Sequence, residues 1–127
     1  MVAISGLMSG FAVKDIDAAK TFYSDTLGLT VDSAGMGNLS IVLPQGGVIV
    51  VYPKPDHAPA TYTMLNLEVA DIDAAVSELT AAGIQFQIYE GAHQDDHGIA
   101  RGKAAGYGPD IAWFLDPSGN ILSVLCN

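Results

Sequence analysis

The heptad VKDIDAA at residues 13–19 is repeated almost unchanged as VADIDAA at residues 69–75. Six of the seven residues agree, and the two copies lie 69 − 13 = 56 residues apart. In a chain of 127 residues, such self-similarity predicts two copies of one structural module.

Each heptad stands at a predicted junction between a strand and a helix. Apolar residues alternate with small or polar ones before both copies, in GLMSGFAV and in TMLNLEV, as in a two-faced strand. Asp15 and Asp71 follow at the position of a helix N-cap, because a short carboxylate can accept hydrogen bonds from free helix N–H groups. Gly28 and Gly83 stand where each helix should end in a left-handed residue.

Three more strands are predicted after each helix, so each half is a βαβββ module and the chain has an α+β fold. The expected strands are residues 29–34, 38–43 and 47–52 in the first half, and 84–89, 110–116 and 120–126 in the second. We expect one domain over residues 1–127, with a first module at 1–56 and a second at 57–127.

The two modules differ in length because of an insertion. The turn glycines Gly46 and Gly119 are 119 − 46 = 73 residues apart, so the second module carries 73 − 56 = 17 additional residues. Most of them must lie in the loop at 90–109, which contains five glycines. A loop of this length is often a lid over a binding site, and its glycines would permit hinge motion.

Three segments, VKDIDAAKTFYSDTLGL, VADIDAAVSELTAAGI and FLDPSGNILSVL, resemble the glyoxalase, bleomycin-resistance and extradiol-dioxygenase superfamily, also called vicinal oxygen chelate proteins. The resemblance covers the whole chain. It implies paired modules whose curved mixed sheets enclose a cleft, a divalent metal ion in many members, and a homodimer in many members.

The resemblance also implies where a metal ion would be held. Metal-using members commonly have a His five residues before the Val that precedes each helix, and a Glu at the fourth residue after the Gly of the final turn. The four corresponding positions are Met8, Val50, Met64 and Ser123. Catalytic divalent ions favour imidazole and carboxylate ligands, so we expect no metal ion at this site and no cofactor.

Strand alternation predicts which side chains line the cleft instead. Leu7, Phe11 and Val13 should pack beneath the first helix, and Trp113 should point to the helix side of the second sheet. The predicted ligand-binding residues on the opposite faces are Met8, Val50, Tyr52, Met64, Asn66, Glu68, Phe114 and Ser123. A mostly apolar cavity with a few polar groups is typical of a small-molecule site.

Several polar residues allow two readings. Arg101 is a candidate to bind an anionic ligand, although a surface ion pair explains it equally well. Glu68 would be a general base if an apolar cleft buries it, and an ordinary exposed carboxylate if it lies at the strand end in water. His57 is a weaker candidate base that a solvated loop would also explain.

His93 and His97 are spaced i, i+4 and could share a metal ion only if their segment were helical. A solvated polar loop is the alternative, because glycines flank the segment. Cys126 lies among apolar residues near the C-terminus, and we expect a buried side chain there rather than a nucleophile.

Composition limits the partners and the compartment. Fourteen acidic and five basic residues give a formal net charge of −9, which disfavours nucleic acid and anionic membranes. The single cysteine fits a reducing compartment. No apolar run approaches the roughly 20 residues of a membrane span, and the N-terminus lacks a secretory signal. We therefore expect a cytoplasmic protein.

The sequence thus favours a protein that binds a small, partly apolar molecule in a metal-free cleft, for resistance or sequestration, and that forms a homodimer. Three alternatives stay open. The first is a metal-dependent lyase, isomerase or dioxygenase with ligands moved to His57, His93, His97 or Asp116. The second is a metal-free acid–base enzyme that uses Glu68 or a loop His. The third is a non-catalytic interaction module whose cleft is filled.

Overall fold

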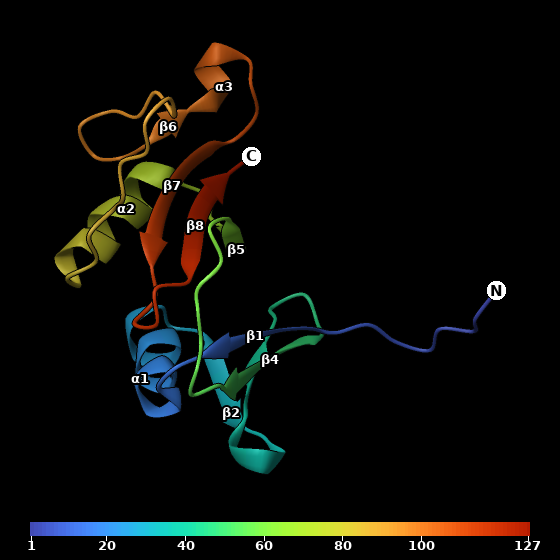
Figure 1. Cartoon of the computed structure of the whole chain (residues 1–127). Helices are drawn as coiled ribbons and strands as arrows, with labels where there is room; N and C mark the ends of the chain where they lie inside the picture. Colours follow the sequence, from blue (N-terminus) through green and yellow to red (C-terminus); the bar gives the residue numbers. More distant parts are fainter. The chain divides into compact units, whose positions relative to one another are not determined.

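The computed structural model describes residues 1–127, which divide into two compact units, Met1–Ala58 and Pro59–Asn127 (Figure 1). Each unit holds one copy of the heptad and one four-stranded mixed sheet. None of the helices is both long and apolar enough to cross a membrane.

The first unit is a βαβββ module. Its elements in chain order are β1 (Ser9–Val13), α1 (Ile16–Thr21), β2 (Thr30–Ser33), a short 3₁₀ turn (Gly35–Gly37), β3 (Leu39–Val42) and β4 (Val48–Pro53). The strand order is β1-β4-β3-β2. Strands β1 and β4 run parallel, and the other two pairs are antiparallel.

The predicted start and end of the first helical segment are confirmed. The Asp15 carboxylate accepts hydrogen bonds from the backbone N–H groups of Asp17 and Ala18 at 3.0 and 3.1 Å, and so caps α1. The helix passes into a π-helical turn over Phe22–Thr26 and is followed by Gly28, whose φ of 72° is left-handed.

The core of the first unit lies between the helical segment and one face of the sheet. Tyr23 is fully buried, and its ring centroid lies 5.6 Å from that of Phe11 and 5.2 Å from that of Phe22. Phe11 is aligned with Val51 of β4, which is also fully buried. Aromatic contacts of this kind add to the stability that burial of the rings provides.

The prediction that Leu7 packs beneath the helix is wrong, because Leu7 is 96% exposed. The parallel register aligns Ser9 with Ile49, so Leu7 falls at the level of Gly47, before the start of β4 at Val48, and finds no partner strand. Residues 1–8 are all exposed, and they extend away from the sheet in Figure 1.

The second unit repeats the module with additional elements. In chain order they are β5 (Thr63–Glu68), α2 (Ile72–Ala81), β6 (Ala100–Arg101), α3 (Gly102–Ala105), β7 (Asp110–Leu115) and β8 (Ile121–Cys126). The strand order is β5-β8-β7-β6, with β5 and β8 parallel and the remaining pairs antiparallel. The α+β fold with two such modules is therefore confirmed.

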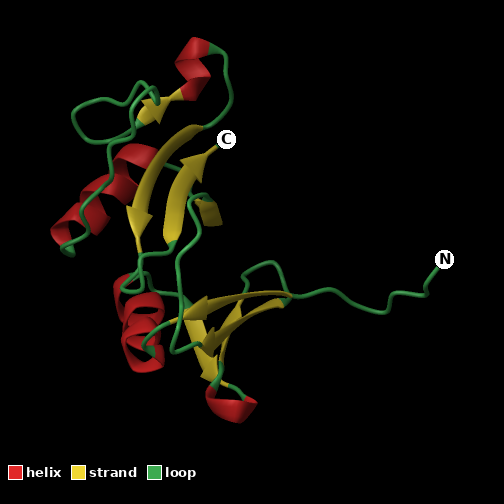
Figure 2. Ribbon diagram, viewed as in Figure 1, coloured by secondary structure: helices red, strands yellow, loops and turns green.

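The second helix also begins and ends as predicted. The Asp71 carboxylate accepts a hydrogen bond from the backbone N–H of Ala74 at 3.1 Å, and Gly83 takes a φ of 96°. Helix α2 lies against the sheet of its own unit (Figure 2), with Ile72 and Val76 buried.

The prediction of a strand at 84–89 is wrong. This segment runs beside β7, since the Gln87 N–H donates to the carbonyl of Trp113 at 2.8 Å, but it forms no regular ladder. The fourth strand of the sheet is instead β6, which lies within the insertion.

Candidate functional site

The second sheet has one face that α2 does not cover, and we call it the open face. Its central row contains Asn66 of β5, Ser123 of β8 and Trp113 of β7, which are direct neighbours across the strands. The Ser123 hydroxyl donates to the Asn66 side-chain oxygen at 2.5 Å. Ser123 is fully buried between its neighbours, whereas Asn66 is exposed.

The predicted faces of Phe114 and Trp113 are wrong and must be exchanged. The β7–β8 register pairs Trp113 with Ser123 and Phe114 with Leu122. Phe114 is fully buried on the face that carries the core, so it lines no open site. Trp113 lies on the open face and is half-buried.

Trp113 is held by two contacts on the open face. Its indole N–H donates to the Thr63 hydroxyl at 3.1 Å. The ring of Tyr89 meets the indole nearly edge-on, with centroids 5.7 Å apart and planes 79° apart. Burial raises the pKa of the Tyr89 phenol, so this group stays neutral at physiological pH.

Two predicted ligand-binding residues on β5 lie in different surroundings from those expected. Met64 is half-buried at a register shift between Thr63 and Leu65. Glu68 is exposed at the end of β5 and accepts a hydrogen bond from the Asn127 amide at 2.8 Å. Of the two readings of Glu68, the structure supports the exposed carboxylate at the strand end, and no apolar cleft buries this group.

The predicted ligand-binding residues of the first unit lie on the face opposite its core. Val50 is aligned with Gly10, and Tyr52 with Ala12. Val50 is half-buried and Tyr52 is 42% exposed. Met8 precedes β1 and is 65% exposed, so it belongs to the exposed N-terminal segment rather than to the sheet.

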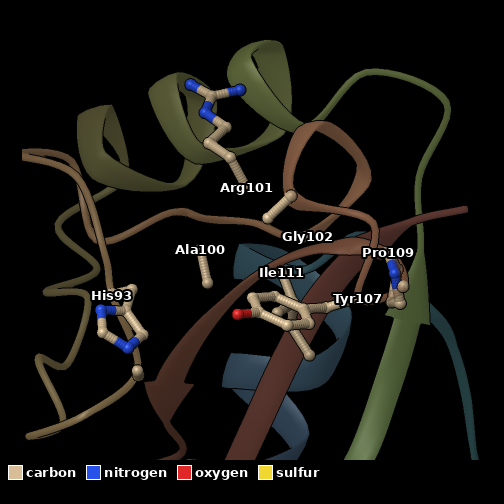
Figure 3. Close-up of a pocket in the computed structure, with 10 residues that line it drawn as sticks. His93, Ala100, Arg101, Gly102, Tyr107, Pro109 and Ile111 are labelled. Carbon is tan, nitrogen blue, oxygen red and sulfur yellow. The ribbon is translucent and has the colours of Figure 1, made fainter.

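A pocket of about 420 Å³ lies where the insertion meets the open face (Figure 3). Nearly all of its wall comes from residues 92–109, and β7 adds Ile111, which is aligned with Leu125 on the open face. Its larger side chains are His93, Tyr107, Pro109 and Ile111. The volume falls in the range of small-molecule sites, roughly 300–1,000 Å³.

The pocket wall depends on a close approach of two backbone segments. A Cβ atom added at Gly102, the first residue of α3, would lie 2.3 Å from the carbonyl oxygen of Pro109 and 3.0 Å from that of Gly108. Only glycine permits this packing, so Gly102 has a steric role there rather than that of a hinge.

Gln94 anchors the insertion, a role that no sequence pattern around it predicts. Its side-chain oxygen accepts from the Tyr89 N–H at 2.8 Å, and its amide donates to the carbonyls of Gln87 and Gly98, each at 2.8 Å. One side chain thus replaces the missing ladder partner of the 84–89 segment.

Arg101 forms a second anchor, and the surface ion-pair reading of this residue is the one that the structure supports. Its guanidinium donates to both carboxylate oxygens of Asp73 on α2 at 3.0 and 2.6 Å. It also donates to Asp95 within the insertion at 3.2 Å. In Figure 3 the side chain points away from the pocket toward α2.

This anchor should respond to pH in a defined direction. The hydrogen bond from Arg101 is the main cause that lowers the pKa of Asp73 below its ordinary value of 3.8. A carboxylate with a lowered pKa in the folded state stabilises fully above its ordinary value and loses that contribution as the pH falls through the lowered one. Asp73→Asn should therefore lower the urea midpoint at about pH 7, with a smaller effect at about pH 3.

The repeat offers a matched control for that measurement. Asp17 occupies the same place in the first heptad, 73 − 17 = 56 residues earlier, and it is exposed. Asp17→Asn should leave the urea midpoint almost unchanged at both pH values. Equal effects of the two substitutions would show that the Arg101 contact contributes nothing.

The three histidines do not form one site. His93 lines the pocket beside the open face, whereas His97 lines a second, more polar hollow at the end of α2. Their segment is not helical, so the i, i+4 spacing does not bring them onto one face. The Nε2 atom of His57 is buried and has no hydrogen-bond partner.

Two other candidates have structural partners. The Asp116 carboxylate is buried and accepts from the N–H groups of Ser118 and Asn120, both at 2.9 Å, within the final turn. Cys126 is buried as expected; its thiol donates to the Ala70 carbonyl at 3.3 Å and accepts from the Lys103 ammonium at 3.1 Å.

The four positions at which the family resemblance implies metal ligands do not fit a divalent ion. Met8 is exposed, and Val50 has no donor atom. Met64 offers only a thioether, and the Ser123 hydroxyl is committed to Asn66. No group of three or more His, Cys, Asp or Glu side chains is arranged to hold a metal ion.

Comparison with known proteins gives a consistent family match. A family model described as Glyoxalase/Bleomycin resistance protein/Dioxygenase superfamily matches residues 6–124. No curated protein shows significant similarity to the chain.

Solved structures share the fold over nearly their whole length. The fosfomycin resistance protein FosX from Listeria monocytogenes is 14% identical with a TM-score of 0.70, over 98% of this chain and 95% of that one. A putative glyoxalase family protein from Bacillus anthracis is 20% identical with a TM-score of 0.70, over 100% and 99%. TnmS3, an antibiotic binding protein from Streptomyces sp. CB03234, is 23% identical with a TM-score of 0.66, over 99% and 98%.

Proposed function

The chain belongs to the Glyoxalase/Bleomycin resistance protein/Dioxygenase superfamily, and on that premise we propose that it binds and sequesters a small, partly apolar molecule without a metal ion. The pocket that the insertion forms with β7 carries this proposal. It is large enough for a small molecule, and it lies beside an open face that presents Trp113 and Asn66.

The chemistry of the site favours binding over catalysis. Glu68, the carboxylate considered as a base, lies in solvent at the end of β5. The family's metal positions offer thioether, alkyl and hydroxyl groups, which are poor ligands for the divalent ions that drive lyase or dioxygenase chemistry. TnmS3 is an antibiotic binding protein of the same fold, and we extend that mode of action to this chain as part of the proposal.

A thermal-shift screen against planar aromatic and antibiotic-like compounds tests the proposal. A ligand at 100 times its Kd should stabilise the folded state by about 2.7 kcal/mol, which raises the unfolding temperature by several degrees. Trp113 is the only tryptophan, so a ligand in this region should also change the intrinsic tryptophan fluorescence.

One control variant and two contradicting outcomes make the screen decisive. Trp113→Phe should remove the fluorescence response, and it should leave the thermal shift of a pocket ligand in place. The proposal fails if no compound raises the unfolding temperature, or if a stabilising compound is converted to product at a steady rate.

A further inference from the structure

The lining of the pocket restricts the kind of molecule that it can take. His93 and Tyr107 supply two aromatic rings, and Ala92, Ala100 and Ala105 supply small apolar surfaces. In Figure 3 the Tyr107 hydroxyl points toward the side on which His93 lies. Rings bordered by such flat surfaces suit a planar ligand, because stacked and edge-on aromatic contacts both need flat faces.

The backbone of His93 is held in an unusual conformation. Its φ of 52° is left-handed, which few residues other than glycine adopt. Gln94, the next residue, is anchored by its three hydrogen bonds and so fixes the chain beside the imidazole. Strained residues of this kind gather at binding sites, where the surrounding structure holds a side chain in place before a ligand arrives.

The charge of the wall is the second restriction. Arg101 is the only cationic residue in the lining, and its guanidinium is bound to Asp73 and Asp95 outside the pocket. This cluster of one cation and two anions has a net charge of −1. Residues 92–109, which supply nearly all of the wall, contain two acidic and two basic residues, so the negative charge of the cluster comes from Asp73 on α2.

An anionic ligand would therefore find no free positive partner in the lining. Burial of a carboxylate, sulfonate or phosphate is costly unless a cation or several donors compensate for it. A neutral ring avoids that cost, and an ammonium group gains from the surrounding negative charge and from the faces of aromatic rings.

We propose that the pocket selects a planar aromatic molecule that is neutral or positively charged, seated against His93 and Tyr107, and that it rejects planar anions. This inference rests on the proposed function and deepens it, because it names the class of ligand for the same pocket.

Three probes that share one ring system test the inference. They are 2-naphthalenemethanol, which is neutral, 2-naphthylmethylamine, which is cationic, and 2-naphthoate, which is anionic. Titration of the full-length, ¹⁵N-labelled protein followed by NMR gives a Kd for each probe, and the amides that shift locate the site. We expect the alcohol and the amine to shift amides within residues 92–111, and the naphthoate to bind at least about tenfold more weakly.

A matched pair of variants tests whether the ligand lies against Tyr107. Tyr107→Ala should weaken binding of the amine by about three- to tenfold. Tyr62→Ala should leave the Kd unchanged, because Tyr62 lies outside the pocket lining, although it is exposed like Tyr107, 70% against 85%. An equal loss in both variants would overturn the placement of the ligand against Tyr107.

The outcomes separate this inference from the proposed function. Naphthoate that binds as tightly as the amine, with the same amides shifting, would overturn the charge selectivity and leave the binding function standing. Amide shifts only outside residues 92–111 would show that the ligand does not bind against His93 and Tyr107. No shift with any of the three probes, even near their solubility limits, would count against both proposals.

Discussion

Replacement of Phe114 by Ala should lower the free energy of unfolding by about 3–5 kcal/mol. Phe114 is fully buried, is aligned with Leu122 of β8, and meets the ring of Phe86 with centroids 5.7 Å apart. Removal of the ring exchanges buried apolar contacts for a cavity that the sheet and α2 can only partly close. Urea unfolding followed by circular dichroism measures the change.

The neighbouring residue provides the control for this prediction. Leu115 is the next residue of β7, and it is 37% exposed on the opposite face of the strand. Leu115→Ala should cost about 1 kcal/mol or less. A larger loss of unfolding free energy in Leu115→Ala than in Phe114→Ala would show that the face of β7 that carries Leu115 is the buried one.

The face of β7 shows what alternation alone leaves undecided. Trp113 and Phe114 are both aromatic, so their order along the strand does not say which one is buried. The final turn decides, because the backbone pair between Asp116 and Asn120 places Leu115 opposite Ile121 and hence Trp113 opposite Ser123. A shift of one residue in that turn would send each side chain to the other face.

Local features were predictable because they depend on few residues. The caps at Asp15 and Asp71 and the left-handed glycines at Gly28 and Gly83 follow from side chains within three or four positions of the helix ends. The repeat then extended each local pattern to a module, and the family resemblance placed both modules in one α+β fold.

The candidate site was less predictable, since distant contacts build it. The sequence does not reveal that the Arg101 guanidinium is already engaged, because its partner Asp73 lies 28 residues earlier in the chain. The pocket itself depends on the close approach at Gly102, which the residue type alone does not reveal. The sequence of the insertion predicts a mobile lid. In the structure, the side chains of Gln94 and Arg101 hold the insertion in place.

The second large effect that we expect is a loss of local stability in the insertion when Gln94 is replaced by Ala. Gln94→Ala would leave the Tyr89 N–H and the carbonyls of Gln87 and Gly98 without their partner. Each abandoned polar group costs about 1–3 kcal/mol when water cannot replace the bond, and less where the segment opens to solvent. The loss should appear as local opening of residues 87–98, with faster amide hydrogen exchange there than in β8.

Gln85→Ala is the matched control, because the Gln85 side chain is exposed and only its backbone carbonyl accepts a bond, from the Gln87 amide at 3.2 Å. It should leave hydrogen exchange at residues 87–98 unchanged. His93 directly precedes Gln94 and lines the pocket, so the same Gln94→Ala variant should also bind the naphthalene probes more weakly. Faster hydrogen exchange with undiminished probe binding would show that ligand binding does not depend on the hydrogen bonds of Gln94. The insertion would then act as a mobile lid.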